Sequence, residues 1–124
     1  MELQPDDNPV IYTIQKLENT HLTIDGSSLA LPLLLSHKDY QSTPVDSPSL
    51  IKTEQLDAWL DSYKPELIII GMGSHHQPLH ASLMTHCHEK RVGFETMTPV
   101  SACHTHRILM SERRPFVMLV YSDI

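Results

Sequence analysis

The sequence predicts a single α/β domain, and three observations lead to that fold class. In residues 65–121, strand-like and helix-like segments alternate in the order strand, helix, strand, helix, strand. Residues 10–35 instead carry short strand-like runs separated by turn residues, as β-hairpins do. The 124 residues suit one compact domain, which can bury a core without disulfides or a structural metal. We therefore expect one domain over residues 10–124, in which hairpins accompany a helix-covered sheet.

The first strand is expected to follow a loose tail of residues 1–9, which contains two prolines and two aspartates. Residues 10–17, VIYTIQKL, place Val10, Tyr12 and Ile14 at alternate positions with polar or mixed residues between them. Because successive side chains of a strand point to opposite faces, this pattern predicts a strand with one buried face.

Two further strand-like stretches follow, HLTID and then LALPLLL at residues 29–35. Asp25 and Gly26 are a strong signal for a hairpin turn, because both residue types tolerate the positive φ that such a turn requires. Pro32 cannot donate a hydrogen bond to a neighbouring strand, so it marks an edge, a bulge or a break between two short strands.

Residues 36–50 are rich in serine, proline and aspartate without any period, and we expect a long loop there. Thr53 is then expected to cap a helix over residues 53–63. The apolar residues that fall at helical spacing and should pack on the sheet are Leu56, Trp59 and Leu60.

The second half supplies the remaining strands and helices. They are a strand apolar on both faces at residues 66–72, a helix at 78–90, a strand at 92–97, a helix at 99–110, and an apolar strand at 115–121 that ends the sheet. Pro78 suits the first position of its helix, and Thr98 followed by Pro99 predicts the capped start of the last helix. The buried stripe of the helix at 78–90 is expected to consist of Leu79, Leu83 and Cys87, with Met84 beside it.

Composition places the chain among soluble globular proteins, since 40% of its residues are hydrophobic and 19% are charged. The formal net charge of -6 argues against binding to nucleic acid. Two cysteines, Cys87 and Cys103, are too few for a disulfide framework and favour the reduced cytoplasm. The N-terminus lacks the apolar core of a secretory signal, and the longest apolar stretch, residues 29–35, is too short to span a bilayer.

The end of the strand at 66–72 carries the first candidate site. Gly71 and Gly73 match half of a dinucleotide-binding fingerprint, but the full motif requires a third glycine where His76 stands. The simplest interpretation is that glycine lets the backbone leave a crowded strand end with positive φ. The alternative is that backbone N–H groups of residues 72–75 face a small anion or a carboxylate.

Nine histidines are many for this length and raise the question of a metal site. His76 and His80 are four residues apart, but Pro78 places the helix start between them. Cys103 and His106 lie three apart on one helix face and form a candidate pair that needs ligands from a second helix. No HExxH or paired CxxC motif is present, so these four residues are weak metal candidates and no cofactor is expected.

Cys103, near the start of the last helix, has two interpretations. A helix N-terminus stabilises a thiolate, which would make the residue reactive or a ligand contact. Alternatively, Ala102 and Cys103 are small residues that let the helix lie close to the sheet. Glu95, on a strand, must face solvent or find a partner, and Arg107 or Arg114 are candidates for a structural ion pair.

The second half of the sequence resembles the Mth938-like family, a domain of unknown function (DUF498) that also includes relatives of mitochondrial complex I assembly factor 3. The resemblance spans residues 10–122 and is most specific over 65–120, in PELIIIGMG, GFETM and SACHTHRILMSERR. Its markers are Gly71, Gly73, Glu95, Met97, Ala102, Cys103, Thr105, Glu112 and Arg114. The sequence departs from the usual pattern at His104, His106, Arg107 and Arg113.

The resemblance implies three layers: a small sheet made by the N-terminal hairpins, a mixed main sheet, and helices on one side of it. It implies no established catalysis. The mitochondrial relatives act by binding partners during assembly of a respiratory complex, and the acidic N-terminus of this chain is more typical of a bacterial member.

We therefore expect a small cytoplasmic protein that binds a protein partner and serves as an assembly or accessory factor for a membrane complex, without nucleic-acid binding or stable membrane insertion. The alternative is a small-ligand protein or enzyme with an anion site between the glycine turn and the N-terminus of the last helix. The candidate residues of that cleft are Gly71, Gly73, Ser74, Glu95, Cys103, Thr105 and Arg114. Histidine-mediated metal binding is the second alternative, and formation of a homo-oligomer through edge strands is left open.

Overall fold

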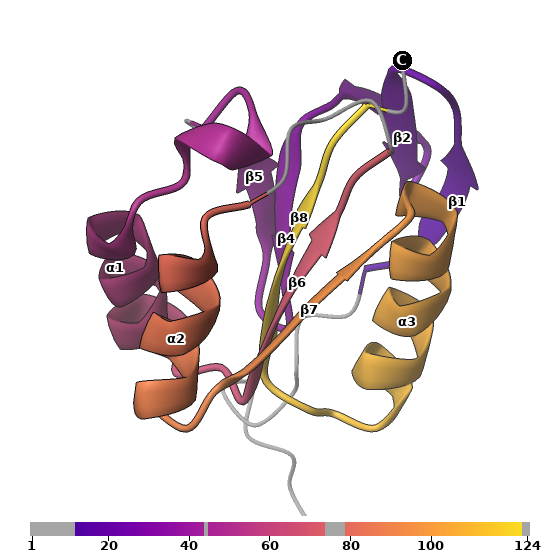
Figure 1. The fold of residues 1–124 in the computed structure, drawn as a ribbon. Coiled ribbons are helices and arrows are strands. Elements are labelled where there is room, and N and C mark those ends of the chain that lie inside the picture. The colour runs from indigo at the N-terminus through magenta and orange to yellow at the C-terminus, as the bar shows by residue number, and fades with distance from the viewer. Residues whose placement is uncertain (1–11, 44, 74–78, 123–124) are drawn as a thin grey trace, which may run out of the picture.

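The computed structural model describes residues 12–43, 45–73 and 79–122, which form two sheets and three α-helices (Figure 1). The loose tail expected at residues 1–9, and the roles predicted for Val10, Ser74, His76 and Pro78, lie outside the described residues. Among the described residues, no helix combines the length and apolar character that crossing a bilayer requires.

The small sheet consists of β1 (Ile14–Leu17), β2 (His21–Ile24) and β3 (Ser27–Ala30), in that order. The main sheet has the order β5-β4-β8-β6-β7, with β4 (Leu33–Ser36), β5 (Tyr40–Ser42), β6 (Leu67–Gly71), β7 (Gly93–Met97) and β8 (Phe116–Val120). The helices are α1 (Thr53–Tyr63), α2 (Ala81–Glu89) and α3 (Pro99–Ser111), preceded by a short 3-10 helix (Pro48–Leu50). Because β4 is antiparallel to β8 while β6 is parallel to it, the main sheet is mixed, as the resemblance implies.

The small sheet forms as the hairpin signals predict. Asp25 and Gly26 turn the chain between β2 and β3 with positive φ angles of 48° and 87°. Groups near β1 secure this turn: Gln15 Oε1 accepts a hydrogen bond from the Gly26 N–H at 2.6 Å, and the Asp25 carboxylate accepts one from the Thr13 N–H at 3.1 Å. Leu22 of β2 is fully buried, so one face of this sheet contributes to the core.

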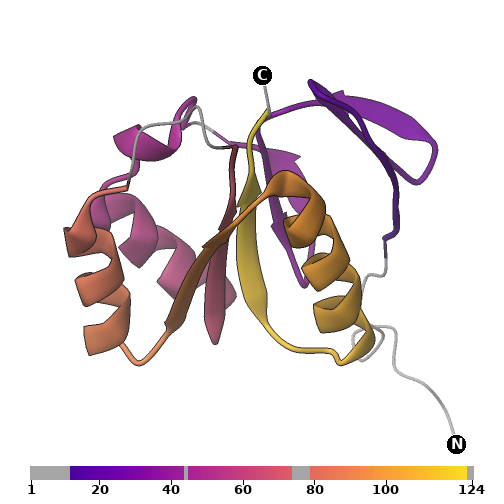
Figure 2. The same cartoon turned by 45° about the vertical axis from the view of Figure 1, so that its right-hand side comes forward.

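Helices cover both faces of the main sheet, so the expectation of helices on one side is wrong (Figure 2). Val117 and Leu119 of β8 pack in one cluster with α1 and α2. The alternate residues Phe116, Met118 and Val120 pack in a second cluster with α3 and the small sheet. A strand that is apolar on both faces requires a covering layer on each side, and α3 together with the small sheet provides the second layer.

The strand predicted at 115–121 does not end the sheet but forms its centre. β8 lies between β4 and β6, and all five of its residues are buried. β6 also lies inside the sheet, hydrogen-bonded to β7 and β8, as its unbroken apolar sequence predicts. The edges of the described main sheet are β5 and β7.

Two predictions for the segment that leads from β4 into α1 are wrong: the long loop and the helix cap. The loop expected at residues 36–50 contains β5 and the 3-10 helix; the exposed side chains of β5 carry no apolar alternation, and it pairs with β4 through its backbone. Thr53 is not the cap but the first residue of α1. Lys52 precedes it, and the Lys52 N–H donates to Gln55 Oε1 at 2.9 Å, so a glutamine in the first turn satisfies this helix end. Of the three alternatives left open at Pro32, an edge, a bulge or a break, the structure shows the break, since β3 and β4 belong to different sheets.

The ends of the other helices follow their local signals more closely. Thr98 Oγ1 accepts a hydrogen bond from the Ser101 N–H at 3.2 Å, and Pro99 is the first residue of α3, as predicted. α2 begins at residue 81 rather than 78. Leu83 and Cys87 are buried as expected, and Leu79, which precedes the helix, is partly buried against the same cluster. Met84, expected beside this stripe, is instead 52% exposed, which corrects that prediction.

Candidate functional site

Gly71 does not open onto a cleft. A Cβ atom added to it would lie 2.8 Å from the Ala102 Cβ and 3.5 Å from the Pro99 Cα, so the first turn of α3 rests directly on this glycine. Its φ is not positive, which corrects the expectation that it serves a left-handed turn. Gly71 is needed for close approach of the helix to the sheet, and Ala102 contributes the other small surface.

The other residues of the predicted cleft serve separate local roles. Gly73 is buried, and Glu95 is exposed on the edge strand β7. The Thr105 hydroxyl donates to Met97 Sδ at 3.4 Å, which fastens α3 to β7. Cys103 is half-buried and packs in the cluster formed by α3 and the small sheet. The structure therefore does not gather these residues around one hollow.

Arg114 lies at the opposite end of the strands from Gly71. It contacts Glu66 through Nε, and its Nη1 lies 3.6 Å from Glu112 Oε1. Glu66 immediately precedes β6, whereas Gly71 ends it. Neither Arg107 nor Arg114 forms an ion pair with Glu95, so the expected pairing is not found.

The weak metal candidates are also separated. His76 lies outside the described residues, His80 precedes α2 on one face of the sheet, and Cys103 and His106 belong to α3 on the other. The described part of the chain contains no group of three histidine, cysteine or acidic residues that could hold a metal ion. Burial raises the pKa of Cys103 to about 11, with a smaller lowering effect from Arg107, so its thiol is protonated at neutral pH.

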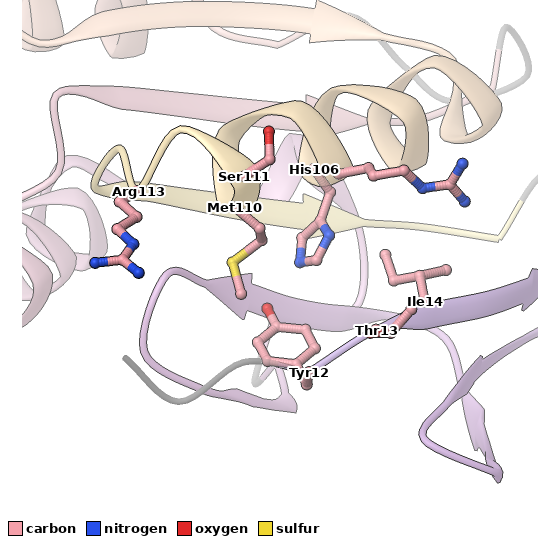
Figure 3. Close-up of a pocket in the computed structure, with 8 residues that line it drawn as sticks. Tyr12, Thr13, Ile14, His106, Met110, Ser111 and Arg113 are labelled. Atoms are coloured by element: carbon pink, nitrogen blue, oxygen red, sulfur yellow. The ribbon is translucent and has the colours of Figure 1, made fainter. Parts of the chain in front are cut away.

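A different candidate site lies between α3 and the chain at β1, where the structure has a cavity of about 320 Å³ (Figure 3). Tyr12, Thr13 and Ile14 line this α3–β1 cavity from one side, and His106 and Met110 line it from α3. Figure 3 shows His106 and Met110 directed from the helix toward Tyr12. Small-molecule sites have volumes of about 300–1,000 Å³, so the cavity is large enough for a small ligand.

His106 is the unusual member of this lining. It is only 2% exposed, and its Nε2 atom has no hydrogen-bond partner among the residues described by the structure. Its ring packs 5.1 Å from the ring of Tyr12 and edge-on at 5.4 Å from that of Phe116, measured between centroids. Burial, and secondly the charge of Arg107, lowers the pKa of His106 to about 4, so the imidazole is neutral at neutral pH. Native proteins rarely leave such an atom unsatisfied, so His106 is the residue of this lining to test for a functional role.

Two of the hydroxyl groups that line the cavity, those of Tyr12 and Ser111, donate hydrogen bonds to the backbone. The Tyr12 hydroxyl donates to the Ser36 carbonyl at 2.8 Å, and burial raises its pKa far above the ordinary value. Ser111 Oγ donates to the Ile108 carbonyl at 2.8 Å. Tyr12 thus presents mainly its apolar ring, while its hydroxyl anchors the start of β1 to β4.

The rim of the cavity is cationic. Arg107 and Arg113 line it and are both exposed to solvent. Arg113 follows α3 in the left-handed conformation, with a φ of 55°. Neither arginine forms an ion pair with a described residue, and no aspartate or glutamate of the described chain lines the cavity.

A second hollow of about 270 Å³ continues the seam between α3 and β1. It shares Ile14 and Arg107 with the α3–β1 cavity. Lys16, Cys103 and His104 are among its other lining residues, and none of its described lining residues is acidic. The two hollows form a continuous basic seam on a chain whose net charge is negative.

Residues 14–120 match the family described as "Protein of unknown function (DUF498/DUF598)". The chain belongs to this DUF498 family. The matched residues include β1, α3 and the lining of the second hollow, whereas Tyr12 and Thr13 of the α3–β1 cavity precede them. No curated protein matches the sequence.

Solved structures show that this DUF498 protein has the Mth938-like fold. A Xanthomonas campestris protein solved by NMR is 22% identical, with a TM-score of 0.81 over 97% of this chain and 93% of that one. A Bordetella pertussis protein described as a Mth938-like domain is 19% identical, with a TM-score of 0.73 over 99% of this chain and 93% of that one. A Bartonella henselae protein described as an outer membrane protein is 21% identical, with a TM-score of 0.75 over 92% and 97% of the two chains. At these identities the likeness concerns the fold alone.

The sequence of this DUF498 protein does not predict the cavity, although it singles out two of the residues that line it. His106 is a weak metal candidate in the sequence, and Tyr12 is expected on a buried strand face. One signal was available: His106 lies on the same buried stripe of α3 as Ala102 and Leu109. Four residues that the resemblance suggested as departures from the family pattern, His104, His106, Arg107 and Arg113, all line the cavity or the second hollow.

Proposed function

We propose that this DUF498 protein acts by binding a small organic molecule in the α3–β1 cavity. His106 carries the proposal, because its buried imidazole lines the cavity and its Nε2 atom has no hydrogen-bond partner among the described residues. Binding is better supported than catalysis, since the hydroxyls of Tyr12 and Ser111 donate to backbone carbonyls and not to a general base.

A blocking variant tests this proposal. Thr13 is exposed and lines the cavity, and its described hydrogen bonds involve only the backbone, so Thr13→Trp adds bulk at the mouth without removing a described side-chain bond. Ser28→Trp is the matched control, because Ser28 is exposed on β3 and does not line the cavity.

We expect octanoate or 1-octanol to shift the Met110 methyl signal in NMR spectra of the wild type and of Ser28→Trp, but not of Thr13→Trp. The proposal is overturned if neither compound shifts this signal in the wild type. It is also overturned if both tryptophan variants respond like the wild type.

We propose as a second candidate the expected role as an assembly or accessory factor for a respiratory complex in the cytoplasm. The resemblance to relatives of complex I assembly factor 3 motivates this role, and one surface feature supports it. Val100 and Ile108 lie eight residues apart on α3 and are 56% and 55% exposed, so two apolar side chains of one helix stripe face solvent. Exposed apolar groups of this kind suit a protein partner.

Co-purification with detergent-solubilised respiratory complexes tests the second candidate. We expect subunits of such a complex to accompany the tagged full chain and to be lost with the double variant Val100→Ser/Ile108→Ser. Leu50→Ser is the control, because Leu50 is 58% exposed but belongs to the 3-10 helix before α1. Equal recovery with the double variant and the control contradicts a docking role for α3.

A further inference from the structure

We propose that the molecule bound in the α3–β1 cavity is an organic carboxylate with an apolar body, an inference that rests on the proposed binding function. The cavity combines three features that favour this class of ligand. Its inner wall is apolar, its rim carries two guanidinium groups without acidic neighbours in the described lining, and a buried imidazole lies in the wall.

The charges of the seam select the sign of the ligand. Arg107 and Arg113 have no ion-pair partner among the described residues, and the second hollow adds Lys16 and His104. Lys16 Nζ lies 3.8 Å from Glu18 Oε1, so the two arginines are the cations most available to an anion. A carboxylate near either guanidinium gains a charge-assisted hydrogen bond, whereas an ammonium group is repelled.

The positive charge of Arg107 affects a titratable residue in each of the two hollows, His106 in the first and Cys103 in the second. It adds to the effect of burial in lowering the pKa of His106, and it opposes the effect of burial on the pKa of Cys103. This charge favours an anion, whereas burial, the larger cause at both residues, disfavours any charged group, so a carboxylate belongs at the exposed rim beside Arg107. Arg107 thus marks the point shared by the two hollows where a carboxylate is best placed.

The interior provides the complementary contacts for the rest of the molecule. Ile14, Met110 and the ring of Tyr12 form apolar walls, which gain free energy from burying hydrocarbon. His106 adds a buried, neutral imidazole to this wall, but its Nε2 atom is closed to solvent and is not counted as a contact for the head group. The hydrocarbon body occupies the apolar space, and the carboxylate stays at the cationic rim.

The other hollows lack one or more of the features that favour an apolar carboxylate. A hollow of about 390 Å³ lies between α2 and β7, but its described lining includes no arginine or lysine, and no buried unsatisfied side-chain atom of the described residues faces it. A smaller one of about 100 Å³ near Val100 and Tyr121 contains Glu18 among its lining residues. The α3–β1 cavity is therefore the better site for an apolar carboxylate.

A series of compounds with one body and different head groups tests the ligand class on the full chain. We expect octanoate to bind at least about tenfold more tightly than 1-octanol, and octylamine to bind more weakly than 1-octanol. Acetate supplies the carboxylate without the apolar body, and we expect no shift of the Met110 methyl signal from it at the same concentrations.

Arginine variants locate the head group. We expect Arg113→Gln and Arg107→Gln each to weaken octanoate about tenfold while leaving 1-octanol unchanged. Arg91→Gln is the matched control, because Arg91 is also exposed, follows a helix and has a left-handed φ of 61°, but does not line the cavity.

The outcomes separate the ligand class from the binding function. If 1-octanol and octanoate bind equally well and Thr13→Trp blocks both, the carboxylate assignment is wrong and the binding function stands. If octanoate is preferred but the variants at Arg107 and Arg113 behave like Arg91→Gln, the assignment of its head group is overturned. If no compound perturbs Met110, both proposals fail.

Discussion

His106 breaks the rule that a buried side chain of an amphipathic helix is apolar. It belongs to the buried stripe of α3 and lies between the rings of Tyr12 and Phe116, but its Nε2 is unsatisfied among the described residues. Tyr12 is similarly buried, yet its hydroxyl has a partner in the Ser36 carbonyl. A local conflict of this kind is typical of functional positions, where stability is sacrificed for an interaction with a ligand.

Replacing His106 by phenylalanine should change how stability depends on pH. Burial lowers the pKa of His106 to about 4 in the folded chain, whereas in the unfolded chain it has the ordinary value of about 6.5. The unfolded chain therefore binds the proton more readily. The part of the free energy of unfolding that depends on neutral His106 is fully present above pH 6.5, and it is lost as the pH falls from there through about 4. Over that window we expect the wild type to lose on the order of 2 kcal/mol more than His106→Phe, measured by urea unfolding.

Tyr12→Phe is the control for this experiment. It removes the neighbouring hydroxyl and its hydrogen bond to Ser36, which should lower the free energy of unfolding by about 1 kcal/mol, but it leaves the imidazole in place. Its stability should therefore keep the pH dependence of the wild type. Parallel pH curves for the wild type and His106→Phe would show that His106 is not a destabilised, buried base.

At the scale of elements, the contact between β6 and α3 determines where the cavity can form. Gly71 lets the first turn of α3 lie directly on the sheet, and the remaining turns then extend along β1. The cavity occupies the part of this seam between Tyr12 and Met110. The glycine that suggested a ligand-binding loop is thus a packing residue for the helix that carries the candidate site.

Gly71→Ala should destabilise the protein by about 1–3 kcal/mol, because the new methyl group would lie 2.8 Å from the Ala102 Cβ and would displace α3. Ala102→Gly should recover part of the loss in the double variant, although glycine within a helix itself costs about 1 kcal/mol. Thermal unfolding of the four proteins gives the coupling free energy between the two positions.

Gly93→Ala provides a comparison on the neighbouring strand. Its added Cβ would meet Leu67 Cδ1 at 3.0 Å, which is the end of a side chain that can move. We expect a smaller loss of stability than for Gly71→Ala. If the losses of stability caused by Gly71→Ala and Ala102→Gly simply add in the double variant, the proposed contact between residues 71 and 102 is contradicted.

The sequence predicted the elements whose signals are local. The hairpin at Asp25-Gly26, the cap at Thr98 and the apolar interior strand β6 all formed as expected. β5 escaped prediction because its pairing depends on the backbone of β4, with no apolar pattern of its own. The α3–β1 cavity was likewise not predictable, since it depends on which face of the sheet α3 covers and on the contact of that helix with a strand about ninety residues earlier.

At the scale of the whole molecule, the main sheet joins two apolar clusters that lie on its opposite faces. One cluster contains residues of α1 and α2, and the other contains residues of α3 and the small sheet. Figures 1 and 2 show these elements on the two sides of the main sheet. β8 contributes buried side chains to both clusters and is hydrogen-bonded to strands on both sides. The centre of the sheet should therefore open only when the protein unfolds globally, while its edges can open locally.

Native-state hydrogen exchange tests this distribution of stability. We expect the amides of β8 and the inner strand β6 to exchange most slowly, because their strands are paired on both sides and covered by a layer on each face. Amides of β5 should exchange much faster, since this edge strand pairs only with β4 among the described strands and its three residues are exposed. Across variants of different stability, such as Gly71→Ala and Gly93→Ala, the amides of β8 should exchange more slowly the higher the free energy of unfolding. Equal protection of β5 and β8, or exchange of β8 that does not follow global stability, would show that the two clusters do not unfold as one unit through the centre of the sheet.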